Sequence, residues 1–243
     1  MRVSSTDMQN NFGKYLKFAE ASEEIIVTRN GKDVAKLTAL SGGDETLIRE
    51  AAANYELSRG SVTYEEFLEL AKTSEQRFEL IDGIVYNLAS PSYKHQHAVQ
   101  ELIGTFYNWF KGKPCKPLTS PFDITLKKEE NNICVVQPDV VVICDKDQID
   151  ANGKYTGTPT LVVEVLSPAT RSKDLIRKLE LYRACGVMEY WIVDPMKEQA
   201  AVYVLTDGEI ADNTYYSNGK DLYVESERFQ GLRVSMRDLF ADF

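Results

Sequence analysis

The sequence predicts an α/β fold of the α+β type, in which helices flank a central mixed sheet. Short apolar runs separated by turn residues indicate strands, and two longer stretches, 92–110 and 171–184, carry apolar residues at helical spacing. The chain has 243 residues, of which 43% are hydrophobic and 27% are charged. These values are typical of a folded globular protein, long enough for one large domain or for a small domain joined to a larger one.

The N-terminal segment, residues 1–42, has a pattern of its own. A short strand precedes a helix for which Ser4 or Ser5 is the expected N-cap. The apolar face of this helix comprises Met8, Phe12, Tyr15, Leu16 and Ala19. The run 25–37 predicts a β-hairpin, because the Asn-Gly pair at its centre favours a tight turn between two strands. A unit of about 40 residues buries too little apolar surface to be stable alone, so we expect it to form a dimer.

Residues 43–61 are predicted to link this segment to a larger domain, 62–243. The glycines at the start of the linker indicate a hinge, and an alanine-rich stretch within it indicates a helix. The larger domain begins with a short helix after Thr63, followed by a hairpin over 78–88. Further strands are expected at 122–126, 133–144, 160–166, 190–193 and 201–205.

The composition excludes several classes of protein. No apolar run is long enough to cross a membrane, and the N-terminus lacks the apolar core of a signal peptide, so we expect a cytoplasmic protein. The cysteines show no metal-binding spacing. We therefore expect reduced thiols, with Cys134 and Cys144 in the cores of strands.

The net charge of −9 counts against binding of nucleic acid by the whole surface. The stretch 171–183 is an exception, since it carries five basic and two acidic residues. It is either a strip that faces phosphates or a solvated helix face. Its basic residues are Arg171, Lys173, Arg177, Lys178 and Arg183.

Two carboxylates stand at unusual places in predicted strands. Asp139 precedes the apolar run 140–144, and Glu164 interrupts the apolar run 161–166. A buried carboxylate is costly unless it is paired or bound to a cation. If the two strands are neighbours, both side chains point into one site, and paired carboxylates on rigid strands suit Mg²⁺. For Asp139 alone, a cap at the start of a strand is the simpler interpretation.

Lys178 is the candidate cationic partner of these acids. In a helix it lies one turn beyond Asp174, and a surface ion pair between the two is one interpretation. The alternative is that Lys178 lies over the carboxylates, where it orients a water or stabilises developing charge.

The runs PDVVVIC and LVVEVLSPATRSKDLIRKLELYRACGVMEYWIVDP resemble the Uma-type endonuclease family of the PD-(D/E)XK restriction-endonuclease-like superfamily. The resemblance covers 62–243 and implies a DNA substrate with Mg²⁺, or alternatively Mn²⁺, as cofactor. It implies that Asp139 and Glu164 are the metal-binding acids. The usual lysine position holds Leu166, so Lys178 is the candidate for a migrated lysine.

The same resemblance implies further site residues. Glu79 is the candidate for an additional acid before the PD element. His95 matches the family's histidine and is a candidate substrate contact, with a surface or capping role as the alternative. Arg171, Lys173 and Arg177 are candidate substrate-binding residues. Tyr182 is interpreted as a core residue or a support for the lysine.

The segment 1–42 resembles the prevent-host-death (Phd/YefM) antitoxins through Val3-Ser4-Ser5, Asn11-Phe12-Gly13 and the run IIVTRNGKDVAKL. The resemblance implies a homodimer that binds operator DNA, with a toxin as a possible partner, although a larger domain replaces the toxin-binding tail. The leading hypothesis is a metal-dependent endonuclease fused to a DNA-binding and dimerisation arm. The alternatives are a catalytically silent DNA-binding regulator, and a nuclease that its own arm restrains.

Overall fold

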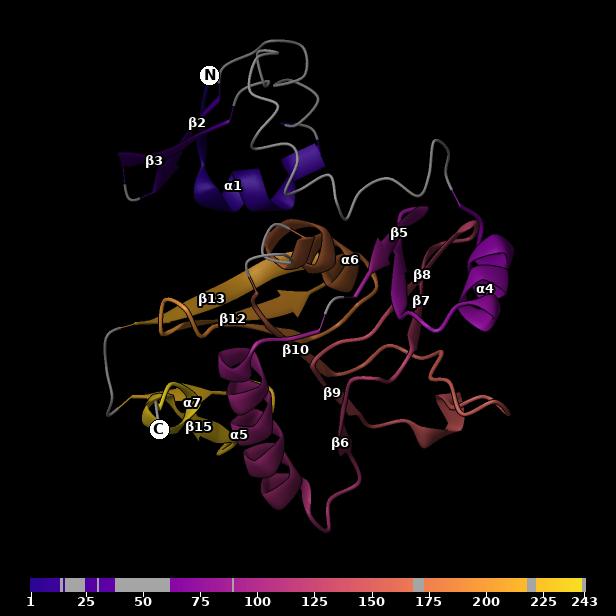
Figure 1. The fold of residues 1–243 in the computed structure, drawn as a ribbon. Helices are drawn as coiled ribbons and strands as arrows, with labels where there is room; N and C mark the ends of the chain where they lie inside the picture. Colours follow the sequence, from indigo (N-terminus) through magenta and orange to yellow (C-terminus); the bar gives the residue numbers. More distant parts are fainter. Residues whose placement is uncertain are drawn as a thin grey trace. The chain divides into compact units, whose positions relative to one another are not determined.

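The computed structural model describes residues 1–13, 15, 25–29, 31–37, 62–88, 90–167, 173–217 and 222–241 (Figure 1). The chain forms two compact units, Met1–Glu50 and Ala51–Phe243. The predicted linker 43–61 lies outside the described residues, and so do Leu16, Ala19 and Arg171.

The N-terminal unit is a three-stranded sheet with one short helix. Its elements are β1 (Arg2–Ser4), α1 (Ser5–Asn10), β2 (Ile25–Arg29) and β3 (Lys32–Leu37). The strand order is β1-β2-β3, with β1 parallel and β3 antiparallel to β2. Ser4 is the N-cap of α1, since its side chain accepts a hydrogen bond from the Asp7 backbone N–H. A small core packs between helix and sheet, formed by Val3, Met8, Tyr15, Ile25 and Val27.

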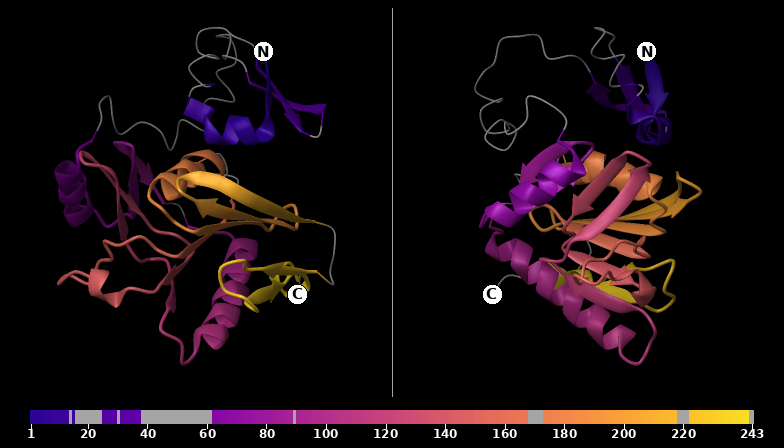
Figure 2. Two further views of the ribbon diagram at one scale, coloured as in Figure 1. Left: turned by 180° about the vertical axis from the view of Figure 1, so that it is seen from behind. Right: turned by 90° about the vertical axis from the view of Figure 1, so that its right-hand side faces the viewer.

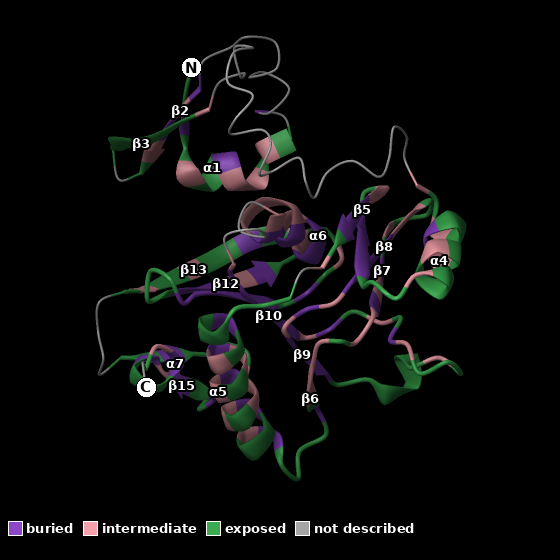
Figure 3. Ribbon diagram, in the orientation of Figure 1, coloured by how far each residue is buried: buried purple, intermediate pink, exposed green. Residues whose placement is uncertain are grey.

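The second unit is built on a six-stranded mixed sheet with the order β13-β12-β11-β10-β9-β6. Only the central pair, β10 with β11, runs parallel; the other pairs are antiparallel. The strands are β6 (Lys116–Thr119), β9 (Val140–Ile143), β10 (Leu161–Val165), β11 (Glu189–Asp194), β12 (Gln199–Thr206) and β13 (Glu209–Ser217). Strands β9, β10 and β11 are buried along their whole length, so both faces of the sheet are covered there (Figure 3).

A second, four-stranded sheet has the order β5-β4-β8-β7. It comprises β4 (Phe78–Ile81), β5 (Ile84–Asn87), β7 (Ile124–Glu129) and β8 (Asn132–Val136). The turn between β4 and β5 contains Asp82 and Gly83, both at positive φ, as the Asp-Gly signal in the sequence predicts. Helix α4 (Tyr64–Thr73) contacts β4 and begins with a capping box between Thr63 and Glu66.

Helices cover opposite faces of the six-stranded sheet (Figures 1 and 2). One face packs on α5 (Tyr93–Phe110) and on the C-terminal elements β14 (Tyr223–Glu225), β15 (Arg233–Ser235) and α7 (Met236–Leu239). The other packs on α6 (Leu179–Ala184). The α+β prediction is therefore confirmed, with helices on both sides of a mixed sheet. None of the helices in the described ranges combines the length and the hydropathy that a bilayer span requires.

The prediction of one continuous strand over 133–144 was wrong. This stretch forms two strands in different sheets, β8 and β9, interrupted at Gln137–Asp139. Pro138 lacks the backbone N–H that a ladder needs, so the chain leaves one sheet there and enters the other. The interruption places Gln137 and Asp139 where the two sheets meet.

The predicted helix 171–184 also differs in form. Its described part is a π-helical segment, Lys173–Lys178, followed by the α-helix α6. Gly186 follows the helix at positive φ, which matches its predicted role after the C-terminus. In a π-helix the backbone hydrogen bond joins residues five apart, so the side chains are distributed differently from those of an α-helix.

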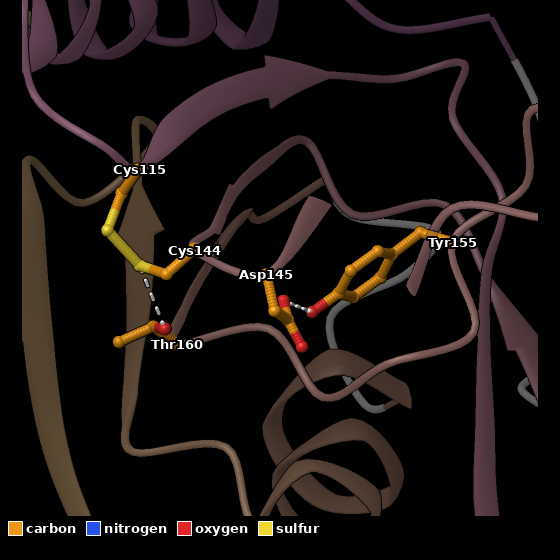
Figure 4. The surroundings of a disulfide bond; sticks show 5 residues. All are labelled: Cys115, Cys144, Asp145, Tyr155 and Thr160. Atoms are coloured by element: carbon orange, nitrogen blue, oxygen red, sulfur yellow. Dashed lines mark hydrogen bonds between the residues drawn. A yellow bond between two sulfur atoms is a disulfide. The ribbon is translucent and has the colours of Figure 1, made fainter. Parts of the chain in front are cut away.

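The prediction of four reduced thiols was wrong for two of them. Cys115 and Cys144 form a disulfide, whereas Cys134 and Cys185 are free (Figure 4). Cys144 lies just beyond β9 instead of inside it. In the ladder between β6 and β9, Lys116 pairs with Ile143, so Cys115 and Cys144 stand opposite each other one step further along. Strand register, which the spacing of the cysteines in the sequence does not reveal, makes this pair.

We expect Cys115→Ser to lower the free energy of unfolding by about 3–4 kcal/mol, because the disulfide closes a loop across a sequence separation of 29. Urea unfolding under non-reducing conditions measures the effect. Cys185→Ser is the matched control, since this thiol is free. Equal stability of the wild type with and without a reductant would contradict the prediction.

Candidate active site

A cavity of about 590 Å³ opens where the two sheets of the second unit approach each other. It is lined by β4, by the link between β8 and β9, by the end of β10, by the first half of α5 and by the π-helical segment. We call it the acidic cavity, because four carboxylates belong to its lining: Glu79, Asp139, Glu164 and Asp174. All four come from different elements, so only the folded chain brings them together.

Glu164 is the central acid, and its direction follows from strand geometry. Side chains alternate between the faces of a strand, so Glu164 shares the α6 side of β10 with Val162. Its Oε1 accepts hydrogen bonds from Lys178 Nζ at 2.8 Å and from the Tyr182 hydroxyl at 2.7 Å. Burial raises the pKa of Glu164 well above its ordinary value; Lys178 opposes this, whereas the neighbouring acids add to it.

The π-helical segment brings two lysines to one carboxylate. Lys173 Nζ lies 2.5 Å from Glu79 Oε2, and Lys178 Nζ lies 2.9 Å from Glu79 Oε1. The two lysines are five residues apart, which is the spacing that a π-turn aligns and an α-helix does not. Glu79 also accepts a hydrogen bond from the Gln137 backbone N–H at 2.9 Å. Both oxygens of Glu79 are therefore occupied by cations.

These contacts determine the charge states. Burial acts to raise the pKa of Glu79, but Lys178 and Lys173 prevail and lower it to about 2. Burial acts to lower the pKa of Lys178, but Glu164, Glu79 and Asp174 raise it well above its ordinary value. Lys178 therefore keeps its positive charge at neutral pH.

The pKa of Glu79 predicts a pH dependence of stability. Its folded pKa of about 2 lies below the ordinary value of 4.5, so its ionised form stabilises the fold above pH 4.5. This contribution, about 3 kcal/mol from the shift, is lost as the pH falls from 4.5 towards 2. We expect Glu79→Gln to be less stable than the wild type at pH 7 and to lose less stability over this range. Urea unfolding at a series of pH values measures both curves, and parallel curves would contradict the prediction.

Asp139 ties the β8–β9 link to β10. Its Oδ2 accepts a hydrogen bond from the Val165 backbone N–H at 2.7 Å and lies 3.3 Å from His95 Nε2. His95 lies in the first turn of α5. Burial acts to lower the pKa of its imidazole, but Asp139 acts to raise this pKa, and the net shift is upward. Its other ring nitrogen, Nδ1, is buried and has no hydrogen-bond partner in the described part of the chain.

The burial of Asp174 decides between the two interpretations of its spacing from Lys178. The pair Asp174–Lys178 is not at the surface: both side chains are about 3% exposed, and Asp174 Oδ1 lies 3.6 Å from Lys178 Nζ. Its backbone carbonyl accepts a hydrogen bond from the Tyr190 hydroxyl at 3.0 Å. The signal that was available is the spacing of four residues from Lys178, which gives proximity but not burial.

The other candidate residues divide between the cavity and the surface. Lys173 belongs to the lining, as do Glu79, Asp139, Glu164, Lys178 and His95. Arg177 does not line the cavity and lies close enough to Asp82 to lower the pKa of that carboxyl. Tyr182 is a core residue, one of its two predicted roles, and its hydroxyl donates a hydrogen bond to Glu164 and not to the lysine. Arg171 lies outside the described residues.

The donor set fits a hard divalent cation in its chemistry. The four carboxylates oppose Lys173, Lys178 and the exposed Arg77, so full ionisation leaves an excess of one negative charge before His95 is counted. Within the described residues, Asp139 Oδ1 and Glu164 Oε2 take part in no hydrogen bond or ion pair. The same residues contain no group of three His, Cys, Asp or Glu side chains that converge enough to hold a metal ion. Within the described ranges, the protein side chains therefore offer at most a pair of ligands at one point.

Comparison with known proteins agrees with this architecture. A protein of Synechocystis sp. described as uncharacterized, slr1290, is 32% identical over 144 residues, which is 59% of this chain and 74% of that protein. A crystal structure of a putative nuclease belonging to DUF820 from Anabaena variabilis superposes with a TM-score of 0.57 at 22% identity, and covers 74% of this chain and 97% of that one. At this identity the likeness shows the fold.

The family models divide the chain as the two resemblances in the sequence predict. The model of antitoxin Phd_YefM, from type II toxin–antitoxin systems, matches residues 1–44. The model Uma2, described as putative restriction endonuclease, matches residues 64–237, which is most of the chain. The protein therefore belongs to the Uma2 family, and its N-terminal segment matches the antitoxin Phd_YefM model.

Proposed function

We propose that this protein is a metal-dependent endonuclease that hydrolyses phosphodiester bonds of DNA. The observation that carries the proposal is the buried Glu164, held by Lys178 and Tyr182 beside Asp139 in one cavity. A structural ion pair alone does not need four carboxylates in one cavity, since a fold normally avoids burying such groups. Family membership and the fold of the Anabaena protein support the same reaction class.

Asp139 and Glu164 are the residues that would hold Mg²⁺ or Mn²⁺ through their remaining oxygens. The bound ion would supply an activated water and neutralise charge on the phosphate. Asp139 is fixed by the Val165 backbone N–H and Glu164 by Lys178 and Tyr182, so neither carboxylate needs to reorganise on binding.

Lys178 then acts as a fixed positive charge. Because its acidic neighbours raise its pKa, it is poorly suited to accept a proton from water and well suited to stabilise charge that develops on the phosphate. Glu79 holds Lys178 and Lys173 in place, and these contacts favour a positioning role for Glu79 over direct metal binding.

The N-terminal unit is proposed to bind DNA and to form a homodimer. In the described part of this unit the core contains five buried hydrophobic side chains, and every side chain of β3 is exposed or half-exposed, with Val34 54% exposed. Such a unit gains stability from a second copy. Sedimentation of the full chain tests the dimer, and a monomer at micromolar concentration would contradict it. The antitoxin match leaves a toxin as the possible partner of this arm.

The test of the proposed reaction is cleavage of supercoiled plasmid in Mg²⁺ or Mn²⁺, with isothermal titration of Mn²⁺ as an independent readout. We expect nicking that EDTA abolishes, and Mn²⁺ binding that Glu164→Ala abolishes. Absence of both nicking and Mn²⁺ binding would favour a catalytically silent DNA-binding regulator. Two features support this alternative: Leu166 at the usual lysine position and the N-terminal match to an antitoxin.

A further inference from the structure

Helix α5 forms a wall of the acidic cavity that the proposed chemistry does not use. The cavity-facing side chains recur at helical spacing and form two short rows. One row is polar, with the amides of Gln96 and Gln100; the other is apolar, with Val99 and Ile103. Leu88, just after β5, adds an apolar side chain to the lining.

This wall differs in charge from the rest of the cavity. The end formed by β4, the β8–β9 link, β10 and the π-helical segment carries four carboxylates and two lysines, whereas the α5 wall beyond His95 carries amide and aliphatic groups. Phosphates are bound by cations and N–H donors, so the amides could contact a phosphate, but the aliphatic row offers it no contact. A flat group with an apolar face and a hydrogen-bonding edge fits both rows.

The volume of the acidic cavity is also sufficient for a flat organic group. At about 590 Å³ the cavity lies within the range of about 300–1,000 Å³ that is typical of pockets for organic ligands. A phosphodiester at the charged end would leave the α5 side unfilled. In a duplex the faces of the bases are stacked on each other, and only an unstacked base presents its face to Val99 and Ile103 and its edge to the amides.

We propose that the α5 wall holds an unstacked nucleobase next to the scissile phosphate, so that single-stranded DNA is the preferred substrate of this cavity. The inference rests on the proposed nuclease function and names its substrate class.

The experiment compares Mn²⁺-dependent cleavage of a fluorescein-labelled single-stranded oligonucleotide with that of a duplex of the same sequence. We expect kcat/KM to be at least about tenfold higher for the single strand, as stacking of one base allows. Gln100→Ala and Ile103→Ala should each raise KM for the single strand by about fivefold and leave kcat within about twofold. Gln100 is exposed, so its variant keeps the fold even if Ile103→Ala weakens the core. The matched control is Tyr107→Ala, on the same helix, 61% exposed and away from the cavity.

The outcomes separate the two proposals. If both substrates are cleaved equally and the variants Gln100→Ala and Ile103→Ala leave KM unchanged, the nucleobase assignment to the α5 wall is overturned, whereas the proposed nuclease function is retained. Cleavage of neither substrate overturns the nuclease. In that case fluorescence anisotropy of the same single strand, measured in EDTA, tests whether the α5 wall binds a nucleobase. A fivefold weaker Kd for Gln100→Ala relative to Tyr107→Ala supports this binding, and an unchanged Kd overturns it.

Discussion

Glu164→Gln is expected to lower the rate of metal-dependent DNA cleavage by about a thousandfold and to abolish Mn²⁺ binding. The amide keeps the shape of the side chain and can still accept hydrogen bonds from Lys178 and Tyr182, but it carries no charge for a cation. Because burial already raises the pKa of Glu164, the neutral amide should leave the free energy of unfolding unchanged or raise it slightly. Loss of activity with retained stability is thus the signature of a metal-binding role.

The control for this experiment is Glu180→Gln. Glu180 lies on α6, only two residues before Tyr182, but it pairs with Lys128 at 3.6 Å and does not line the cavity. We expect wild-type cleavage and wild-type Mn²⁺ binding. If Glu164→Gln retained both properties, Glu164 would be a structural partner of Lys178, and the metal site would have to be sought elsewhere.

Lys178→Met is expected to lower the cleavage rate by about 100- to 1,000-fold, because it removes the cation next to the reacting phosphate. It should also cost about 3–5 kcal/mol of stability, since Glu79 and Glu164 lose a buried partner. Unfolding in urea and single-turnover cleavage measure the two effects. Unlike Glu164→Gln, this variant should retain Mn²⁺ binding, which separates charge stabilisation from metal ligation.

Lys173→Met is the matched control for this lysine. It removes the other ammonium from Glu79 but leaves the contact between Lys178 and Glu164 intact. We expect a loss of stability with a rate reduction of less than about tenfold. Equal rate losses for the two variants would mean that both lysines act only by holding Glu79, and the role of Lys178 at the phosphate would be withdrawn.

The sequence predicted three of the four acids that line the cavity, namely Glu79, Asp139 and Glu164. A carboxylate inside the apolar run of β10 has no local explanation, so Glu164 was recognisable without any structure. The Asp-Gly turn, the helix α5 and the glycine after α6 were predicted for local reasons that the fold preserves. The two family resemblances were visible in runs of residues and were confirmed by the family models.

The sequence did not reveal which side chains are buried together. The spacing of Asp174 and Lys178 allowed either a surface pair or a position of Lys178 over the carboxylates, because spacing gives neighbours along a helix, whereas burial depends on the sheets packed against it. The π-helical winding was not predictable either, and it is this winding that brings both Lys173 and Lys178 to Glu79. The disulfide between Cys115 and Cys144 likewise depends on the register between β6 and β9.

The sequence by itself thus determined the family and predicted three of the four cavity acids and the lysine Lys178. Local patterns suffice for these because each is a matter of residue type and spacing along the chain. Only the tertiary structure decided that Glu79 holds two lysines, that Asp174 is buried and that α5 offers a neutral wall to the cavity. The physical reason is that charge state and pairing depend on burial and on neighbours from distant segments, and these exist only when the sheets and helices have packed.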